Sequence, residues 1–181
     1  MRLEGTDPSG SGINEQKVNK EGQALSFSVT QSEIEHESEQ GGSAYNWHSL
    51  KVDIDAADTV LLLKNTSDTH LHIERIWISN GGLAAEYQIH LPTTEVTPTG
   101  GTLVTGTNIN TTSSNVADAV ARSDETNNVQ GNILHIVFMA TNVTVGIQIP
   151  GLILGKNKSV GIDVVDNVVE SAATITGHYE D

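Results

Sequence analysis

Cysteine is absent from this chain, basic residues are few, and aromatic residues make up only 4% of it. Without cysteine there are no disulfide bonds and no thiolate metal sites. Only nine lysine and arginine residues stand against 23 aspartate and glutamate residues, which gives a net charge of -14. Because phosphates are bound by clusters of basic side chains, this balance argues against nucleic acid and anionic membranes as partners.

Long apolar runs are absent as well. No run reaches the roughly 18–20 residues that a membrane-spanning helix needs. The first residues also lack the apolar core of a secretory signal peptide. We therefore expect neither insertion into a membrane nor export by a signal peptide.

The length of 181 residues fits one domain with a tail. Residues 1–23 are rich in small and polar side chains and bury too little apolar surface to offset the entropy of ordering. We expect an extended N-terminal arm at 1–23, ordered by a partner, and a folded body at 24–181. The candidate docking residues of the arm are its basic and large apolar ones: Arg2, Leu3, Ile13, Lys17, Val18 and Lys20.

The body consists of short runs in which apolar and polar residues alternate, as they do in half-buried strands. About eight strands separated by turns, with almost no helical periodicity, predict an all-β fold: an antiparallel β-sandwich or jelly roll. The expected strands are 24–31, 45–54, 59–65, 69–80, 84–91, 133–140, 143–149, 159–165 and 172–179.

Three of these strands carry more specific predictions. The run 59–65 is apolar throughout, which is typical of a strand covered on both faces. In 69–80 the apolar residues move from odd to even positions near Glu74 and Arg75, which predicts a β-bulge. For 45–54 the expected buried face is formed by alternate apolar residues: Leu50, Val52 and Ile54.

Two regions give weaker patterns. The stretch 92–132 is rich in turn-forming residues, with β-like pieces at 102–105 and 107–109 and either a helical turn or a strand at 116–120. We expect short strands within it or packing against a neighbour, because structureless loops of this length are unusual. The acidic segment 32–42 allows a short helical turn.

Histidines and a glutamate suggest one metal site. His70, His72 and Glu74 occupy alternating positions on one face of a strand, from which they could converge on a metal. A polar outer face opposite Leu71 and Ile73 explains them better, because alternation itself requires polar residues there. We expect no metal and no cofactor. The single histidines on other strands are expected at strand surfaces or interfaces: His48, His90 and His135.

No set of residues indicates catalysis. Asp53, Asp55 and Asp58 resemble a fragment of a calcium loop but lack its glycine turn and closing glutamate. We interpret them, with Asp163 and Asp166, as solvated carboxylates at turns. The chain has no nucleophile elbow and no phosphate-binding glycine fingerprint, and no carboxylate pair stands out for sugar cleavage. We expect no catalytic residue and no enzymatic activity, and a hydrolase is the least favoured hypothesis.

The few aromatic residues allow two interpretations. Tyr45, Trp47 and Trp77, with Tyr87, could form a surface on which a sugar stacks. Packing in the core or in a subunit interface is favoured, because so few aromatic residues are available for either purpose.

Several runs together resemble a family. The runs are 50–54, 60–68, 71–76, 100–103 and 150–161, with an asparagine-rich stretch after the fourth. They are similar to small virion proteins of tailed bacteriophages, over roughly residues 24–180. The resemblance implies a head decoration (cement) protein or a fibre- or spike-base protein, usually a jelly-roll homotrimer. It includes no catalytic or metal motif, and no single functional residue is transferred by it.

The leading hypothesis is thus a structural virion protein, assembled in the host cytoplasm. Its arm and its subunit contacts would bind the major capsid protein or another virion protein. Arg2, Lys17 and Lys20 make the arm mildly basic, so it could dock on an acidic shell while the acidic body faces solvent. The alternative is a receptor- or glycan-binding spike or fibre module that uses Tyr45, Trp47 or Trp77.

Overall fold

The computed structural model describes residues 4–6, 13–15, 33–52, 59–126, 131–165 and 170–180. Contacts divide the chain into two units, 1–32 and 33–181. In the first unit, β1 (Glu4–Thr6) and β2 (Ile13–Glu15) form an antiparallel pair with Thr6 opposite Ile13. Several predictions fall outside the described residues: those for Arg2, Leu3, Lys17, Val18, Lys20, Asp53, Ile54, Asp55, Asp58, Asp166 and the strand 24–31.

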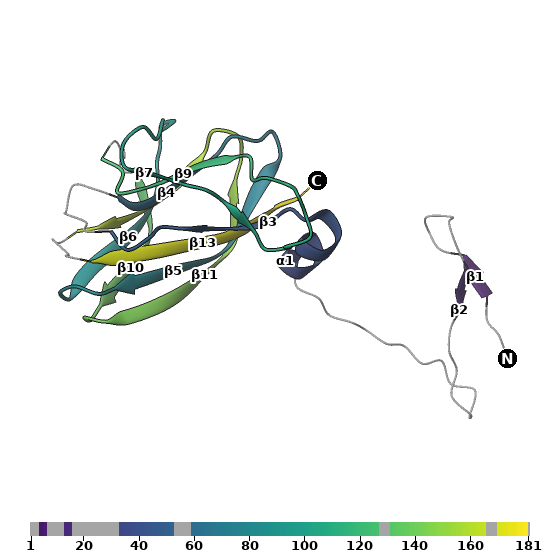
Figure 1. The fold of residues 1–181 in the computed structure, drawn as a ribbon, viewed down its shortest axis with the longest axis horizontal. Coiled ribbons are helices and arrows are strands. Elements are labelled where there is room, and N and C mark those ends of the chain that lie inside the picture. The colour runs from purple at the N-terminus through teal and green to yellow at the C-terminus, as the bar shows by residue number, and fades with distance from the viewer. Residues whose placement is uncertain are drawn as a thin grey trace, which may run out of the picture. The chain divides into compact units, whose positions relative to one another are not determined.

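The second unit is built almost entirely of strands (Figure 1). It begins with α1 (Glu33–His36) and a π-helical turn, η1 (Glu37–Gly41), in the acidic segment that allows a helical turn. The strands that follow are β3 (Ala44–His48), β4 (Thr59–Asn65), β5 (His70–Asn80), β6 (Ala85–Leu91), β7 (Thr102–Val104), β8 (Thr107–Asn108), β9 (Ala119–Ser123), β10 (Asn132–Met139), β11 (Val143–Leu154), β12 (Ser159–Val164) and β13 (Ser171–Glu180). None of the helices in these residues has the length and apolarity to cross a membrane.

The strands form two antiparallel sheets packed face to face. Sheet I has the order β10-β6-β12-β4-β9-β7, and sheet II has the order β11-β5-β13-β3-β8. When β7, β8 and β9 are left out, eight strands remain from β3 to β13. Numbered 1 to 8 along the chain, they have the order 2-7-4-5 in sheet I and 1-8-3-6 in sheet II. This is the double Greek key of a jelly roll. The expected jelly roll of about eight strands is confirmed, and the three short strands extend its sheets.

The core lies between the sheets. Its largest fully buried side chains include Trp47, Tyr87, Ile76 and Ile162. Each fully buried leucine or isoleucine contributes about 1.5–3 kcal/mol. Every residue of β4 is buried, as the continuous apolar run predicts.

The predicted bulge in β5 is confirmed. Arg75 lies opposite Thr176 of β13, whereas Ile73 lies opposite Gly177, so Glu74 is the inserted residue. The partner β11 also has an irregularity, between Gln148 and Leu152. The sequence predicts that this strand ends at 149, but it continues to 154, because the bulge accommodates Pro150, which cannot donate to the ladder.

The predicted buried face of the strand at 45–54 is wrong for Leu50, whereas Val52 is half-buried and packs against the core. The odd-numbered residues Tyr45, Trp47 and Ser49 are buried, whereas Leu50 is 74% exposed. Two aromatic side chains bury more apolar surface than Leu50 does, and they set the phase. In the irregular stretch, β7 and β8 match the predicted pieces, whereas β9 begins only at the end of the third piece, 116–120.

Candidate functional site

The outer face of sheet II is open to solvent along four strands. We call it the open face and define it by the outward-pointing residues of β11, β5, β13 and β3, all exposed or half-buried: Thr144, Gly146, Gln148, Arg75, Trp77, Ser79, Ala172, Thr174, Thr176, Asn46 and His48. Arg75 carries the only formal charge in this set, although the chain as a whole has a net charge of -14.

Trp77 forms an aromatic platform on the open face. The side chain is 40% exposed, and Gly146 lies opposite it on β11. A Cβ atom on Gly146 would lie 2.6 Å from Cζ3 and 2.8 Å from both neighbouring ring atoms. These nearly equal distances place the face of the six-membered ring directly over the glycine. The missing side chain of Gly146 therefore lets the indole lie flat on the sheet.

The guanidinium group of Arg75 lies over the ring of Trp77, with Cζ 5.4 Å from the ring centroid. Within the described part of the chain, Arg75 forms no ion pair. Most other basic side chains there are engaged by acidic side chains or carbonyls: Lys51 with Glu170, Lys64 with Glu95, Lys156 with Asp68, and Arg122 with Gly100 and Gly101. Arg75 thus offers a positive charge that its surroundings do not neutralise.

Polar side chains around the platform are held by cross-strand hydrogen bonds. His48 Nδ1 and Thr174 Oγ1 are 2.7 Å apart, and Thr176 Oγ1 donates to Asn46 Oδ1 at 2.6 Å. His48 therefore lies on a strand surface, as the sequence predicts, and is exposed. Hydroxyl, amide and imidazole groups therefore stand in fixed positions next to an aromatic plane.

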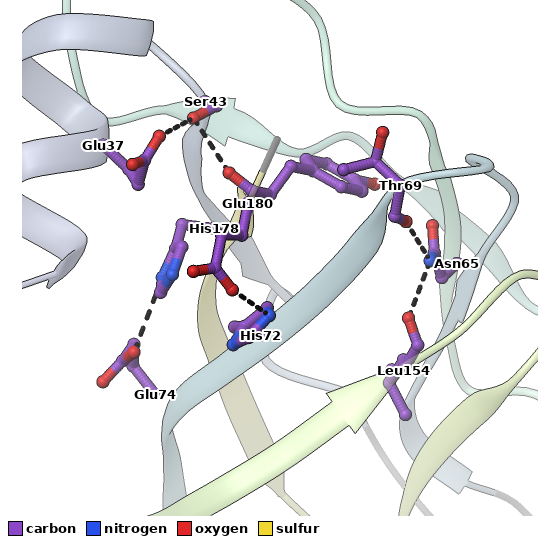
Figure 2. A network of polar contacts seen from close by, with 10 residues as sticks. Glu37, Ser43, Asn65, Thr69, His72, Glu74, Leu154, His178 and Glu180 are labelled. Atoms are coloured by element: carbon purple, nitrogen blue, oxygen red, sulfur yellow. Dashed lines mark hydrogen bonds and ion pairs between the residues drawn. The ribbon is translucent and has the colours of Figure 1, made fainter. Parts of the chain in front are cut away.

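Beyond the bulge the same sheet carries two histidine–glutamate pairs (Figure 2). The rings of His72 and His178 stack with centroids 5.2 Å apart. His72 Nε2 lies 2.9 Å from Glu180 Oε2, and His178 Nδ1 lies 3.5 Å from Glu74 Oε1. Among the described residues no group of three or more histidine or carboxylate side chains is arranged to hold a metal. His72 and Glu74 thus belong to separate pairs, while His70 is exposed at the start of β5.

The C-terminal strand is tied to the helical turn next to these pairs. Ser43 Oγ donates to Glu37 Oε2 at 3.1 Å and to the Tyr179 carbonyl at 3.2 Å. On the other side, Asn65 Nδ2 donates to the carbonyls of Thr69 and Leu154. His178 is 1% exposed, so its imidazole is buried, whereas the partner carboxylates Glu74 and Glu180 reach solvent. Sequence reasoning did not single out His178, whose only signal was its place in an alternating strand.

The central part of the outer face of sheet I is buried, unlike the open face. Its outward-pointing Leu62, Lys64, His90 and Asp163 are all buried. The segment 92–100 crosses it: Lys64 Nζ pairs with Glu95 Oε1 at 2.7 Å, and Val96 is buried outside the main core.

The predictions for His90 and Asp163 are wrong. Asp163 accepts a hydrogen bond from Thr59 Oγ1 at 2.6 Å and lies 3.3 Å from His90 Nε2. The two side chains are 4% and 2% exposed, so neither is a solvated or surface group. Alternation correctly places them outside the core, but it does not reveal that they are buried on the outer side. Their burial gives them a structural role.

Tyr45, Trp47 and Trp77 do not form a common surface on which a sugar could stack. Tyr45 and Trp47 are 2% and 0% exposed and pack together with ring centroids 5.9 Å apart. The favoured interpretation, packing in the core, is confirmed for both. Burial raises the pKa of Tyr45 and of Tyr179 above the ordinary value. Only Trp77 remains available to a ligand.

The edge strands on one side of the sandwich are apolar and carry no formal charge. From 126 to 155 the sequence has no aspartate, glutamate, lysine or arginine over 30 residues. This stretch contains β10 and β11, the edge strands of the two sheets, joined by a short turn. We call these edges the apolar side; its exposed large hydrophobic residues are Ile133, Leu134, Ile136, Phe138, Val143 and Ile153. His135 is also exposed there, as expected.

The edge strands of the two sheets differ in how they are protected. β7 and β8 have three and two residues, and β11 is interrupted at Pro150 and Gly151. β10 has eight residues, no proline and no charge, with one irregularity between Ile133 and His135. Phe138 on this strand is 79% exposed, beside a hollow of about 410 Å³. Long, flat apolar edges invite pairing with another chain.

No family model matches this chain, and no match is found among curated proteins or solved structures. The fold alone assigns no function, because jelly rolls occur in viral capsids, lectins and cupins. The functional argument therefore depends on the open face and the apolar side.

Proposed function

We propose that this protein is a structural virion protein of a tailed bacteriophage. In this proposal it is a jelly-roll subunit that joins copies of itself through the apolar side and stabilises a capsid. The observation that carries the proposal is the charge-free apolar side of an otherwise strongly acidic chain. The resemblance of its sequence to small virion proteins and its jelly-roll topology support the same role.

Charge explains why the apolar side suits a second copy of the chain. Two bodies that each carry many carboxylates repel one another wherever their acidic surfaces approach. A stretch of 30 residues without any formal charge removes that repulsion. Burial of exposed side chains such as Phe138 and Ile136 then favours association, by about 25 cal/mol per Å² of apolar surface. A basic partner would instead bind the acidic turns.

The N-terminal arm is proposed to attach the protein to the capsid. Arg2, Lys17 and Lys20 are one third of all basic residues of the chain. A mildly basic segment attached to an acidic body can dock on an acidic shell while the body faces outward. The major capsid protein, or another virion protein, would be its partner.

Self-association is tested by light scattering coupled to size-exclusion chromatography. The unmodified protein should elute as a closed oligomer, a trimer under this proposal. The double variant Ile136→Asp, Phe138→Asp should be monomeric with an unchanged circular dichroism spectrum. Val116→Asp is the matched control, because Val116 is 78% exposed and precedes β9, which lies towards the other end of sheet I from β10. An unmodified protein that stays monomeric at high concentration would rule out the subunit contact.

The virion role needs a separate experiment. Purified tailed-phage heads should carry the full-length protein into the pellet on sedimentation. A chain lacking residues 1–20 should remain in the supernatant and keep its β-sheet spectrum. If the truncated chain sediments as well as the full chain does, the arm is not the tether. If neither chain sediments with heads, the capsid role is wrong.

A further inference from the structure

We infer that the open face binds a sugar that carries a carboxylate, with the sugar ring stacked on Trp77 and the carboxylate held by Arg75. This binding function goes beyond the proposed structural role and does not depend on it. A body that is bound to a larger particle would present this face to a glycan.

The indole of Trp77 is presented as a platform. Its ring lies flat over Gly146, so one aromatic face is directed away from the sheet, and the side chain is 40% exposed. The C–H groups on one side of a pyranose ring pack on such a plane, because the aromatic face carries partial negative charge. The other tryptophan, Trp47, is fully buried in the core. The chain thus holds one indole in the solvent-exposed position that stacking needs.

The positive charge of Arg75 favours a sugar with a carboxylate over a neutral sugar. A guanidinium group binds a carboxylate through two parallel hydrogen bonds. Arg75 lies over the Trp77 ring with Cζ 5.4 Å from its centroid, and it has no ion pair within the described part of the chain. No aspartate or glutamate belongs to the open face, so an anion can approach there although the chain as a whole would repel it.

The surrounding polar groups fit sugar hydroxyls. Gln148 lies opposite Arg75 on β11 and is exposed, and Thr176 lies opposite it on β13. The pair Thr176–Asn46 and the pair His48–Thr174 add donors and acceptors towards β3. Four strands at about 4.8 Å spacing extend over about 14 Å, which is the length of a short oligosaccharide. A few well-placed polar groups beside an aromatic surface are typical of sites that fix the orientation of a ligand.

Saturation-transfer NMR and calorimetry with defined oligosaccharides test the inference. The probes are one oligosaccharide containing glucuronic acid, one ending in N-acetylneuraminic acid, their neutral counterparts, and a sulfated sugar. At least one carboxylated probe should bind, and bind at least tenfold more tightly than its neutral counterpart. Absence of binding by both carboxylated probes at millimolar concentration would overturn the inference. Equal binding of the sulfated sugar would overturn the assignment to a carboxylate.

Variants separate the two contacts. Trp77→Ala should weaken binding at least tenfold, and Arg75→Gln should remove the preference for the carboxylated sugar and leave weak neutral binding. Gly146→Val displaces the indole without changing either binding residue and should act like Trp77→Ala. Unchanged affinity in a folded Gly146→Val or Arg75→Gln variant would contradict the site.

The control separates this inference from the subunit contact. The double variant Ile136→Asp, Phe138→Asp should lose self-association but keep the affinity of each site for the sugar. If it loses sugar binding, the site belongs to the apolar side and the open-face assignment is wrong. If sugar binding is absent while the oligomer forms, this inference fails and the structural role stands.

Discussion

The two outer faces of this sandwich follow the same alternation of residues but differ in what covers them. On sheet I the segment 92–100 reaches over the face through the Lys64–Glu95 pair, and Lys64 and Asp163 are buried there. On sheet II the outer face of β11, β5, β13 and β3 stays open to solvent, with Trp77 exposed. The comparison shows that polar residues at alternate positions have a stabilising role on one face and are free for a ligand on the other.

The largest expected effect lies on the covered face. Asp163→Ala removes the acceptor of Thr59 and the partner of buried His90, which should lower the free energy of unfolding by about 3 kcal/mol. Thr174→Val on the open face breaks a hydrogen bond to exposed His48 and should change it by about 0.5 kcal/mol. Urea unfolding monitored by circular dichroism measures both. Equal losses would mean that the two faces do not differ in this way.

A smaller effect is expected where the indole lies over glycine. Gly146→Val fills the space under Trp77 and should displace the ring into solvent, at a cost of about 1 kcal/mol or less, since valine favours strands. Acrylamide quenching of tryptophan fluorescence should increase, because Trp47 remains buried. Gly155→Ala is the control, since an added Cβ there meets nothing closer than 3.9 Å. Unchanged quenching would show that the ring does not rest on Gly146.

The covering segment can be loosened with a still smaller change in global stability. Lys64→Met keeps the apolar stem but loses the pair with Glu95, which should cost about 1 kcal/mol or less. Amide hydrogen exchange in 92–100 should accelerate, while exchange in β12 changes little. Lys156→Met, which removes the exposed pair with Asp68, should leave exchange in 92–100 unchanged. Uniform acceleration along the chain would indicate global rather than local loosening.

The core between the faces should respond to pH only at alkaline values. Burial raises the pKa of Tyr45, Tyr87 and Tyr179 above 10.0, so the unfolded state releases these protons first. The contribution of the neutral tyrosines to stability is therefore complete below pH 10 and is lost as the pH rises further. Absorbance at the phenolate band should rise together with unfolding, and the unfolding midpoint should not change between pH 7 and 9 from this cause. Phenolate formation near pH 10 in folded protein would mean that one of these tyrosine side chains is exposed to solvent and not buried in the core.

Much of this arrangement could be predicted from the sequence, because burial in a strand has a period of two. The shift from Leu71 and Ile73 to Ile76 and Ile78 locates the bulge at Glu74. The same pattern is insufficient at 45–54, where two apolar phases compete and the aromatic one prevails. Periodicity assigns a side chain to one side of a sheet, and only that.

The functional surfaces depend on contacts between distant segments. Alternation cannot show that Glu95 pairs with Lys64, nor that Gly146 lies beneath a ring 69 positions earlier in the chain. The sequence did hold one readable signal that motif searches miss: the absence of charge from 126 to 155. That signal becomes meaningful once β10 and β11 are known to be neighbouring sheet edges.

The strand order of the jelly roll also determines when each strand can pair during synthesis. β3 pairs with β13, β4 pairs with β12, and β5 lies between β11 and β13, so early strands depend on late partners. A ribosome must therefore release nearly the whole chain before β5 can pair with strands on both of its sides. Such distant pairings make folding slow, and the early strands wait with open edges. The net negative charge of the first half of the chain would then keep incompletely folded molecules from associating until the last strand has paired.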